Sequence, residues 1–326
     1  MISRILDSKT KNTISRAVEK RSLAQDRRSA YKSTFFRVIL QAALLLTMLI
    51  LLVLLVSVFL NGTDHILSRL GDFLNGTMRS RSVDEKLGVH QALYGSLWIV
   101  IIVAVCAFPL GIGAAIYLEE YAPENRFTAF IEVNINNLAG VPSVVYGLLG
   151  LALLVNGQIF GLDRITGGRS TLSAGLTLAV LVLPIVVITA SEAIKAVPNS
   201  LREAAYGVGA TKWEVIRTQV LPYAAPGVLT GTLLSVSRAV GETAPLILVG
   251  AVSGRLGPNP GLFEMSALTD KFTALPLVIT SWTQQSGRDV GFTAAAAAAI
   301  VVLLVVVLVV NSVAIGLRNR FEKKRG

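Results

Sequence analysis

NSLREAAYGVGATKWEVIRTQVLP, residues 199–222, is the one long polar interval between two strongly apolar segments in the second half of the chain. Ser200 and Glu203 fit the S-x-x-E spacing of a capping box, in which a hydroxyl and a carboxylate each pair with an unbonded backbone N–H at a helix start. Thr211 and Glu214 repeat that spacing. The pattern therefore predicts two helix starts within this short polar stretch.

Two glycines, Gly207 and Gly209, lie between the predicted helix starts. Glycine lets a helix end and the chain turn without a clash of Cβ with the backbone. We therefore expect two short helices around a glycine elbow, held at a membrane surface by the apolar segments on either side.

The composition is that of a membrane protein. The chain has 326 residues, of which 53% are hydrophobic and only 15% are charged, too apolar for a soluble domain of this size. The single cysteine, Cys106, excludes an internal disulfide framework, and neither His65 nor His90 has a partner at metal-ligand spacing. We expect no metal and no cofactor.

Apolar runs predict an all-α, polytopic fold with six transmembrane helices. The first run, 38–60, spans the roughly 30 Å hydrocarbon core and exceeds the apolar region of a cleavable signal peptide, about 7–15 residues, so we expect it to be retained. The third run, 127–155, begins with several polar residues, so non-helical or re-entrant backbone is possible there. The remaining runs are 92–118, 127–155, 172–194, 223–251 and 292–317.

The expected division follows from these runs. The segments are a basic tail (1–37), the first helix (38–60), a polar loop (61–91), a core of five helices containing the polar stretch 199–222 (92–317) and a basic tail (318–326). With six spans, 20 of the 30 Lys and Arg lie on the side of the termini and 9 on the other. Because Lys and Arg collect on the cytoplasmic side, we expect both tails and residues 199–222 to be cytoplasmic, and the loops 61–91 and 252–291 to be extracytoplasmic.

Arg238 is the one basic residue that falls within a predicted span. It follows Pro226 by 12 residues, about 18 Å along a helix. An arginine at mid-membrane costs roughly 2.5–3.5 kcal/mol, and Glu242 at i+4 can compensate. The two residues form either a self-neutralising pair that aids insertion or an anion site in a translocation pathway.

If Arg238 and Glu242 bind an anion, the pair would favour anions that carry a proton. A guanidinium fork matches phosphate oxygens. The adjacent carboxylate would repel a fully ionised anion and accept a hydrogen bond from a protonated one, and phosphate keeps an O–H near neutral pH whereas sulfate does not. In the third span, the hydroxyls of Ser143 and Tyr146 could also donate to an oxyanion, although hydroxyls in helix bundles usually bond to backbone or to a neighbouring helix.

The polar stretch also resembles the EAA loop of ABC-importer permeases, with Gln219 where that family usually has Ile. The resemblance implies a cytoplasmic coupling helix that docks into a groove on an ATPase subunit. The residues that carry it are Glu203, Ala204, Ala205, Gly209, Leu221 and Pro222.

Three further segments resemble the phosphate-importer permeases, more the PstA-type than the PstC-type subunit. They are SRAVGETAP (237–245), GVPSVVYG (140–147) and YLEEYA (117–122), and with the EAA stretch they extend over about 92–317. The resemblance implies the type I permease fold in the inner membrane of a prokaryote, with inorganic phosphate as substrate. It also implies three partners: a PstC-type permease, a PstB-type ATPase dimer and an extracytoplasmic PstS-type binding protein.

Catalytic motifs are absent from the sequence. It contains no G-x-x-x-x-G-K-[ST], no H-E-x-x-H and no G-x-S-x-G, so we expect no catalytic residue and no ATP hydrolysis by this chain. Its basic residues follow membrane topology, so we expect no nucleic acid partner. The alternatives are a permease for another oxyanion, such as molybdate, sulfate or phosphonate, an ion-coupled carrier or channel working alone, and, least favoured, an intramembrane enzyme.

Overall fold

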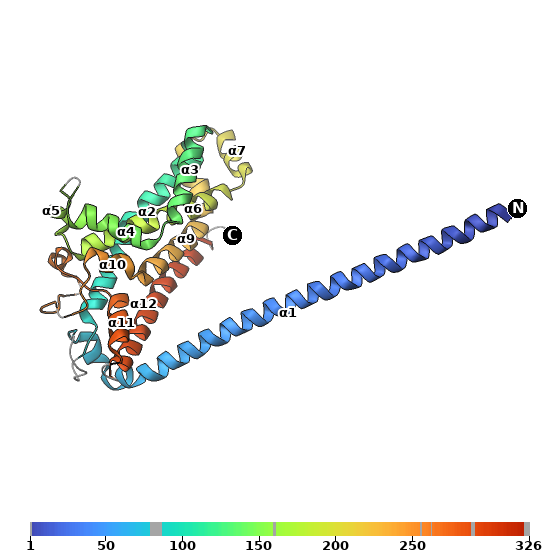
Figure 1. The fold of residues 1–326 in the computed structure, drawn as a ribbon. Helices are drawn as coiled ribbons and strands as arrows, with labels where there is room; N and C mark the ends of the chain where they lie inside the picture. The colour runs from blue at the N-terminus through green and yellow to red at the C-terminus, as the bar shows by residue number, and fades with distance from the viewer. Residues whose placement is uncertain are drawn as a thin grey trace. The chain divides into compact units, whose positions relative to one another are not determined.

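The computed structural model describes residues 2–78, 87–158, 161–254, 256–261, 263–287 and 291–322, and almost all of the regular structure in them is helical (Figure 1). The chain divides into two compact units, Met1–Ser57 and Val58–Gly326. The longer helices are α1 (Ile2–Asn75), α2 (His90–Ile116), α3 (Arg126–Ala139), α6 (Thr171–Lys195), α9 (Leu221–Gly241), α11 (Leu275–Gln285) and α12 (Gly291–Glu322). The shorter helices are η1 (Tyr117–Tyr121), α4 (Ser143–Gly150), η2 (Leu151–Val155), α5 (Asp163–Thr166), α7 (Asn199–Gly207), α8 (Lys212–Val215), η3 (Ile216–Val220), α10 (Ala244–Val249) and η4 (Met265–Thr269). The predicted all-α class is confirmed.

The first apolar run forms part of α1. The portion Phe35–Thr63 is 29 residues long and apolar, which is long enough to cross a membrane. The helix continues to Asn75, with non-helical backbone only at Arg69, so the prediction of a loop from residue 61 is wrong. Near the end of this helix, Phe73 is buried, with 1% of its surface exposed.

The third predicted span is broken. α3 and the α4–η2 segment meet at an angle of 99°, across Gly140–Pro142. Proline lacks an N–H and disfavours helical backbone at the residue before it, so Pro142 ends one helix and starts the next. The possibility of non-helical backbone in this segment is confirmed, and the predicted span 127–155 consists of two helical parts.

The fifth predicted span also divides. α9 ends at Gly241 and Glu242 has extended backbone. α10 (Ala244–Val249) is followed by Gly250, which has a φ of +99°. Pro245 lies in the first turn of α10, where a missing N–H costs nothing. Residues 223–251 are therefore two helices with a break two residues wide, and Glu242 lies just beyond the end of α9.

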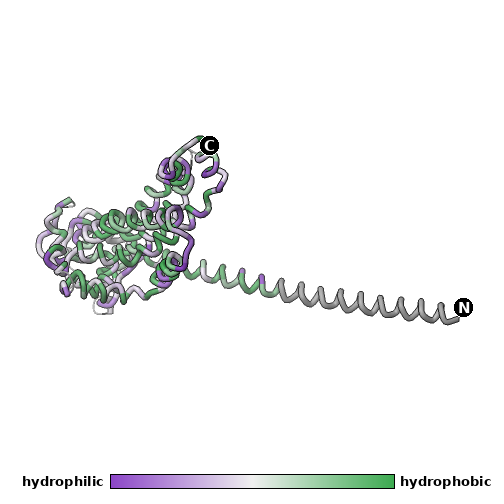
Figure 2. The backbone as a smooth tube through the Cα atoms, turned by 90° about the horizontal axis from the view of Figure 1, so that it is seen from above, coloured by the Kyte–Doolittle hydropathy of each residue, from purple (hydrophilic) through white to green (hydrophobic). Residues whose placement is uncertain are grey.

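The centre of the larger unit is a helix bundle around α6. The most extensive contacts join α2 to α6, followed by those of α6 with α9. At Gly175 in α6, an added Cβ would lie 2.7 Å from the Cβ of Ile102, so glycine permits the close approach of α2. Figure 2 shows hydrophobic residues along much of the packed helical backbone and hydrophilic residues mainly in the connecting loops.

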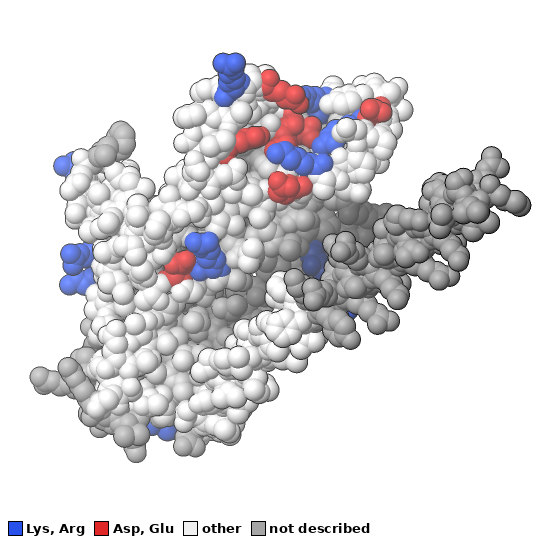
Figure 3. Space-filling model, turned by 45° about the vertical axis from the view of Figure 1, so that its right-hand side comes forward, with Lys and Arg blue, Asp and Glu red and all other residues white. Residues whose placement is uncertain are grey.

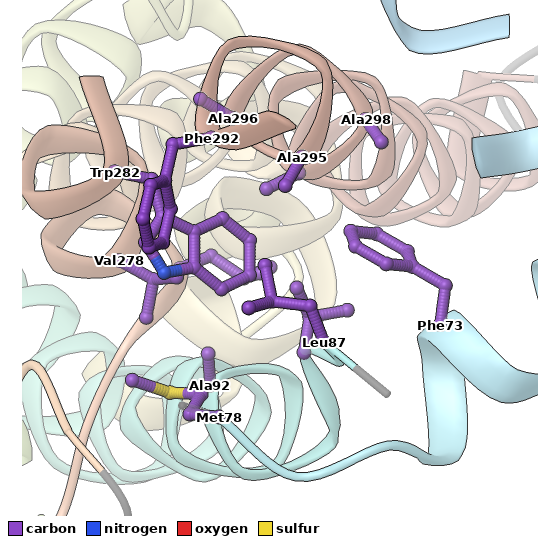
Figure 4. Packing of buried hydrophobic residues seen from close by; sticks show 13 residues of the cluster. Phe73, Met78, Leu87, Ala92, Val278, Trp282, Phe292, Ala295, Ala296 and Ala298 are labelled. Atoms are coloured by element: carbon purple, nitrogen blue, oxygen red, sulfur yellow. The ribbon is translucent and has the colours of Figure 1, made fainter. Parts of the chain in front are cut away.

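A second core lies at the end of the unit opposite α7 (Figure 1). There α11 packs on α12 and on the segment around Phe73 and Leu87, with Trp282 only 1% exposed (Figure 4). The predicted loop 252–291 thus contains a buried helix. The expected close approach at the alanine run is confirmed, because a Cβ on Gly62 would lie 3.0 Å from the backbone N of Ala298.

Candidate translocation and coupling sites

Arg238 lies in the last turn of α9 and pairs with Glu242. The distance from Nε of Arg238 to Oε1 of Glu242 is 3.4 Å, and the two side chains are 43% and 20% exposed. A cation is favourable at a helix C-terminus, where the carbonyl dipoles point outward. The expected ion pair is confirmed, although it spans the end of α9 and does not lie on a continuous helix.

The two predicted pathway segments meet beside this pair. α4 packs against α10, and a Cβ on Gly147 would lie 2.8 Å from the Cα of Pro245. The hydroxyl of Tyr146 donates to the carbonyl of Leu138 at 2.9 Å, which ties α4 to α3 across the break.

Ser143 begins α4, one turn before Tyr146, and its side chain is half-buried. Residues three apart share a face of a helix, so the two hydroxyl-bearing side chains lie on the same side of α4. Ser143 and Tyr146 thus follow the break between α3 and α4, Arg238 and Glu242 lie at the break between α9 and α10, and α4 packs against α10.

Asn311 also lies beside the Arg238–Glu242 pair and was not predicted from the sequence. Its Oδ1 accepts a hydrogen bond from the hydroxyl of Ser237 at 3.0 Å, which joins α9 to α12 directly beside Arg238. An asparagine within the long apolar run of α12 was the available signal, because a polar side chain at membrane depth needs a partner.

The glycine elbow has the predicted form with one correction. Thr211 and Glu214 make the expected capping box, with the N–H of Thr211 donating to Oε2 of Glu214 at 2.7 Å, and Gly209 has a φ of +86°. Ser200 and Glu203 make no such box. Because α7 begins at Asn199 directly after Pro198, Ser200 already lies within the first turn.

The elbow presents an unusual outer surface. Glu203 and Ala204 are exposed, and three large apolar side chains are exposed with them: Tyr206 at 44%, Val208 at 86% and Trp213 at 54%. Three other residues of the EAA stretch lie beneath this surface or in the next helix. Ala205 packs on the core beneath the elbow, and Leu221 and Pro222 form the first turn of α9. Figure 3 shows charged residues gathered at this end of the molecule, around α3 and α7, while the middle is largely uncharged.

Comparison with known proteins identifies the family of this chain. Residues 107–324 match the family model described as "Binding-protein-dependent transport system inner membrane component". The chain belongs to this family. It is therefore a multi-pass component of a membrane transporter and not itself an enzyme, which agrees with the expected class.

Individual relatives agree with the family. The chain is 43% identical over 166 residues to the phosphate transport system permease protein PstA of Mycobacterium leprae, an alignment that covers 50% of this chain and 51% of that protein. It is 32% identical to the PstC protein of Xylella fastidiosa over 269 residues, 76% of this chain and 82% of the relative. The chain thus spans about half the length of the PstA relative and most of the PstC relative.

A solved structure shares the fold. The crystal structure of a bacterial ABC transporter involved in the import of alginate superposes with a TM-score of 0.57 at 18% identity, covering 86% of this chain and 95% of that one. At this identity the likeness shows the fold alone, an importer-permease bundle.

Proposed function

We propose that this chain is a permease subunit of an ATP-driven importer of inorganic phosphate, and that it forms half of the translocation pathway beside a homologous PstC-type permease. The observation that carries the proposal is the Arg238–Glu242 pair, placed where α9 breaks and α4 packs alongside. Two relatives whose names specify phosphate transport support the choice of anion.

The geometry of the pair suits an anion that still carries a proton. Glu242 contacts Arg238 through Nε, and within the described residues the guanidinium makes no other ion pair. The two Nη groups can then donate to the oxygens of an oxyanion. The carboxylate of Glu242 accepts the P–O–H of phosphate, whereas it repels sulfate and molybdate, which have no such proton at neutral pH.

The two hydroxyls on α4 take different parts in this proposal. Tyr146 already donates its proton to Leu138, so its oxygen can act only as an acceptor toward bound phosphate. Ser143, half-buried on the same side of α4, donates to a phosphate oxygen. Both residues then line the path together with Arg238 and Glu242.

The elbow of α7 and α8 is the proposed coupling surface. Its exposed apolar side chains, Tyr206, Val208 and Trp213, suit a protein groove better than water. We assign this surface to a PstB-type ATPase dimer, with both termini on the same cytoplasmic side. A PstS-type binding protein then delivers phosphate to the opposite end, where α11 packs.

The decisive experiment is transport by the purified assembly. The chain is co-purified with its partners, reconstituted in proteoliposomes and tested for uptake of labelled phosphate with and without ATP. We expect ATP-dependent phosphate uptake, and little uptake of sulfate, molybdate or a phosphonate. Preference for another oxyanion would reassign the cargo, and uptake by this chain alone without nucleotide would replace the importer with an ion-coupled carrier.

A further inference from the structure

The end of the second span is tied to the coupling helix by a buried ion pair. Arg202 of α7 donates to Oε1 of Glu120 in η1 from Nε at 3.2 Å and from Nη2 at 2.9 Å. The side chains are 18% and 7% exposed. Charge-assisted bonds shielded from water are strong, so this contact holds the two elements together.

The same guanidinium also closes the end of α6. Nη2 of Arg202 donates to the carbonyl of Ile194 at 3.1 Å, and Nη1 donates to that of Val197 at 2.7 Å and to Oδ1 of Asn199 at 3.1 Å. The carbonyl of Ile194 also accepts from the N–H of Val197 at 3.1 Å, so Arg202 adds a side-chain donor at the end of α6. One side chain therefore bonds to η1, to the end of α6 and to the start of α7.

Two weaker contacts surround this pair. Nζ of Lys195 lies 3.3 Å from Oε1 of Glu119, with the lysine side chain 50% exposed, and Nζ of Lys212 lies 4.8 Å from the ring centroid of Tyr121. The acceptor side of all these contacts is η1, a π-helical turn at the end of α2, the kind of helix irregularity that often marks functional sites. YLEEYA, which contains η1, thus faces the coupling loop.

We propose that Glu120 and Arg202 are a positioning pair that makes α7, the end of α6 and η1 move as one body. Motion imposed on α7 then reaches α2 directly, as well as passing through η3 into α9. The inference rests on the proposed coupling role of the elbow. It assigns Glu120, 82 positions from Arg202 in the sequence, to the transmission of that motion.

The test measures transport per ATP hydrolysed by the complete importer in proteoliposomes. Glu120→Gln keeps an oxygen that accepts from Arg202 but removes the charge. We expect phosphate moved per ATP to fall about tenfold, within the range typical of coupling between sites, while assembly and basal ATP hydrolysis stay near wild type. The matched control is Glu119→Gln, whose partner Lys195 is half exposed, and its ratio should stay within about twofold of wild type.

An unchanged ratio in Glu120→Gln, or an equal loss of hydrolysis and transport, overturns the proposal. If that variant fails to assemble, Arg202→Lys replaces it, because lysine keeps the charge but loses the forked contacts to Ile194 and Val197. A wild-type ratio in Arg202→Lys also overturns the proposal. If the wild-type importer carries another anion, the proposal of phosphate as substrate is wrong. The number of those anions transported per ATP hydrolysed then still tests the role of Glu120 and Arg202.

Discussion

Two arginines in this chain pair with glutamate in opposite ways. Arg202 is mostly buried, pairs with Glu120 of a distant helix and donates to several backbone and side-chain oxygens. Arg238 is 43% exposed and pairs with Glu242, four residues away, through a single contact of 3.4 Å.

The difference separates a structural guanidinium from one that can bind a ligand. The donors of Arg202 are largely used within the protein, so its charge fixes elements in place. Arg238 uses only Nε in its contact with Glu242, so its two Nη groups remain able to donate to a ligand. Glu242 lies at the break between α9 and α10. An arginine that only aided insertion would gain from fuller internal pairing, because an unpaired charge at membrane depth is costly.

The largest expected effect comes from Arg238. We predict that Arg238→Met reduces phosphate uptake by the importer at least about 100-fold, since it removes the charge that attracts the anion and the donors that hold it. Arg238→Lys keeps the charge without the fork and should still lose about tenfold or more. Uptake kinetics of the assembled complex measure both, and uptake near wild type in either variant contradicts the comparison.

The converse prediction concerns stability. Arg202→Met leaves the buried carboxylate of Glu120 unpaired, which costs about 3–5 kcal/mol. Arg238→Met breaks a single contact of 3.4 Å in a proposed water-lined path, where water solvates Glu242 and such pairs contribute about 1 kcal/mol or less. The Tm of the purified importer should therefore fall clearly for the first variant and little for the second. Equal shifts would remove the distinction between the two arginines.

Packing around Arg238 supplies the next test. Gly147→Ala places a Cβ 2.8 Å from both Pro245 Cα and Leu248 Cδ1, so we expect α4 to be displaced from α10. Overpacking of this kind costs about 1–3 kcal/mol and should lower both Tm and phosphate uptake. Gly113→Ala is the matched control, because an added Cβ there has no neighbour within 4 Å. Equal behaviour of the two variants would mean that this contact has no role in the site.

The smallest expected effect is on selectivity. Glu242→Gln still accepts a hydrogen bond from protonated phosphate but no longer repels a dianion. We predict that the preference for phosphate over sulfate falls about tenfold, with phosphate uptake itself less affected. Competition of sulfate with the uptake of labelled phosphate measures this preference. An unchanged preference in Glu242→Gln would show that Glu242 does not select between the two anions.

Local patterns predicted part of this structure. The apolar runs located the spans, and the Thr211–Glu214 spacing predicted a cap that forms. The same spacing at Ser200 failed, because a capping pattern does not say at which residue the helix begins. Arg238 and Glu242 were paired from their spacing alone, although the helix that was expected to carry both ends at Gly241.

The sequence by itself determined the membrane class, the glycine elbow and the intramembrane charge pair, because hydropathy, capping and i,i+4 spacing act between near neighbours. Tertiary structure alone decided the burial of α11 and the contact of Arg202 with Glu120. These features depend on which surfaces meet when distant segments pack. The packing of distant segments must leave few buried polar groups unpaired across the whole bundle. A short window of sequence does not specify which distant segments pack together.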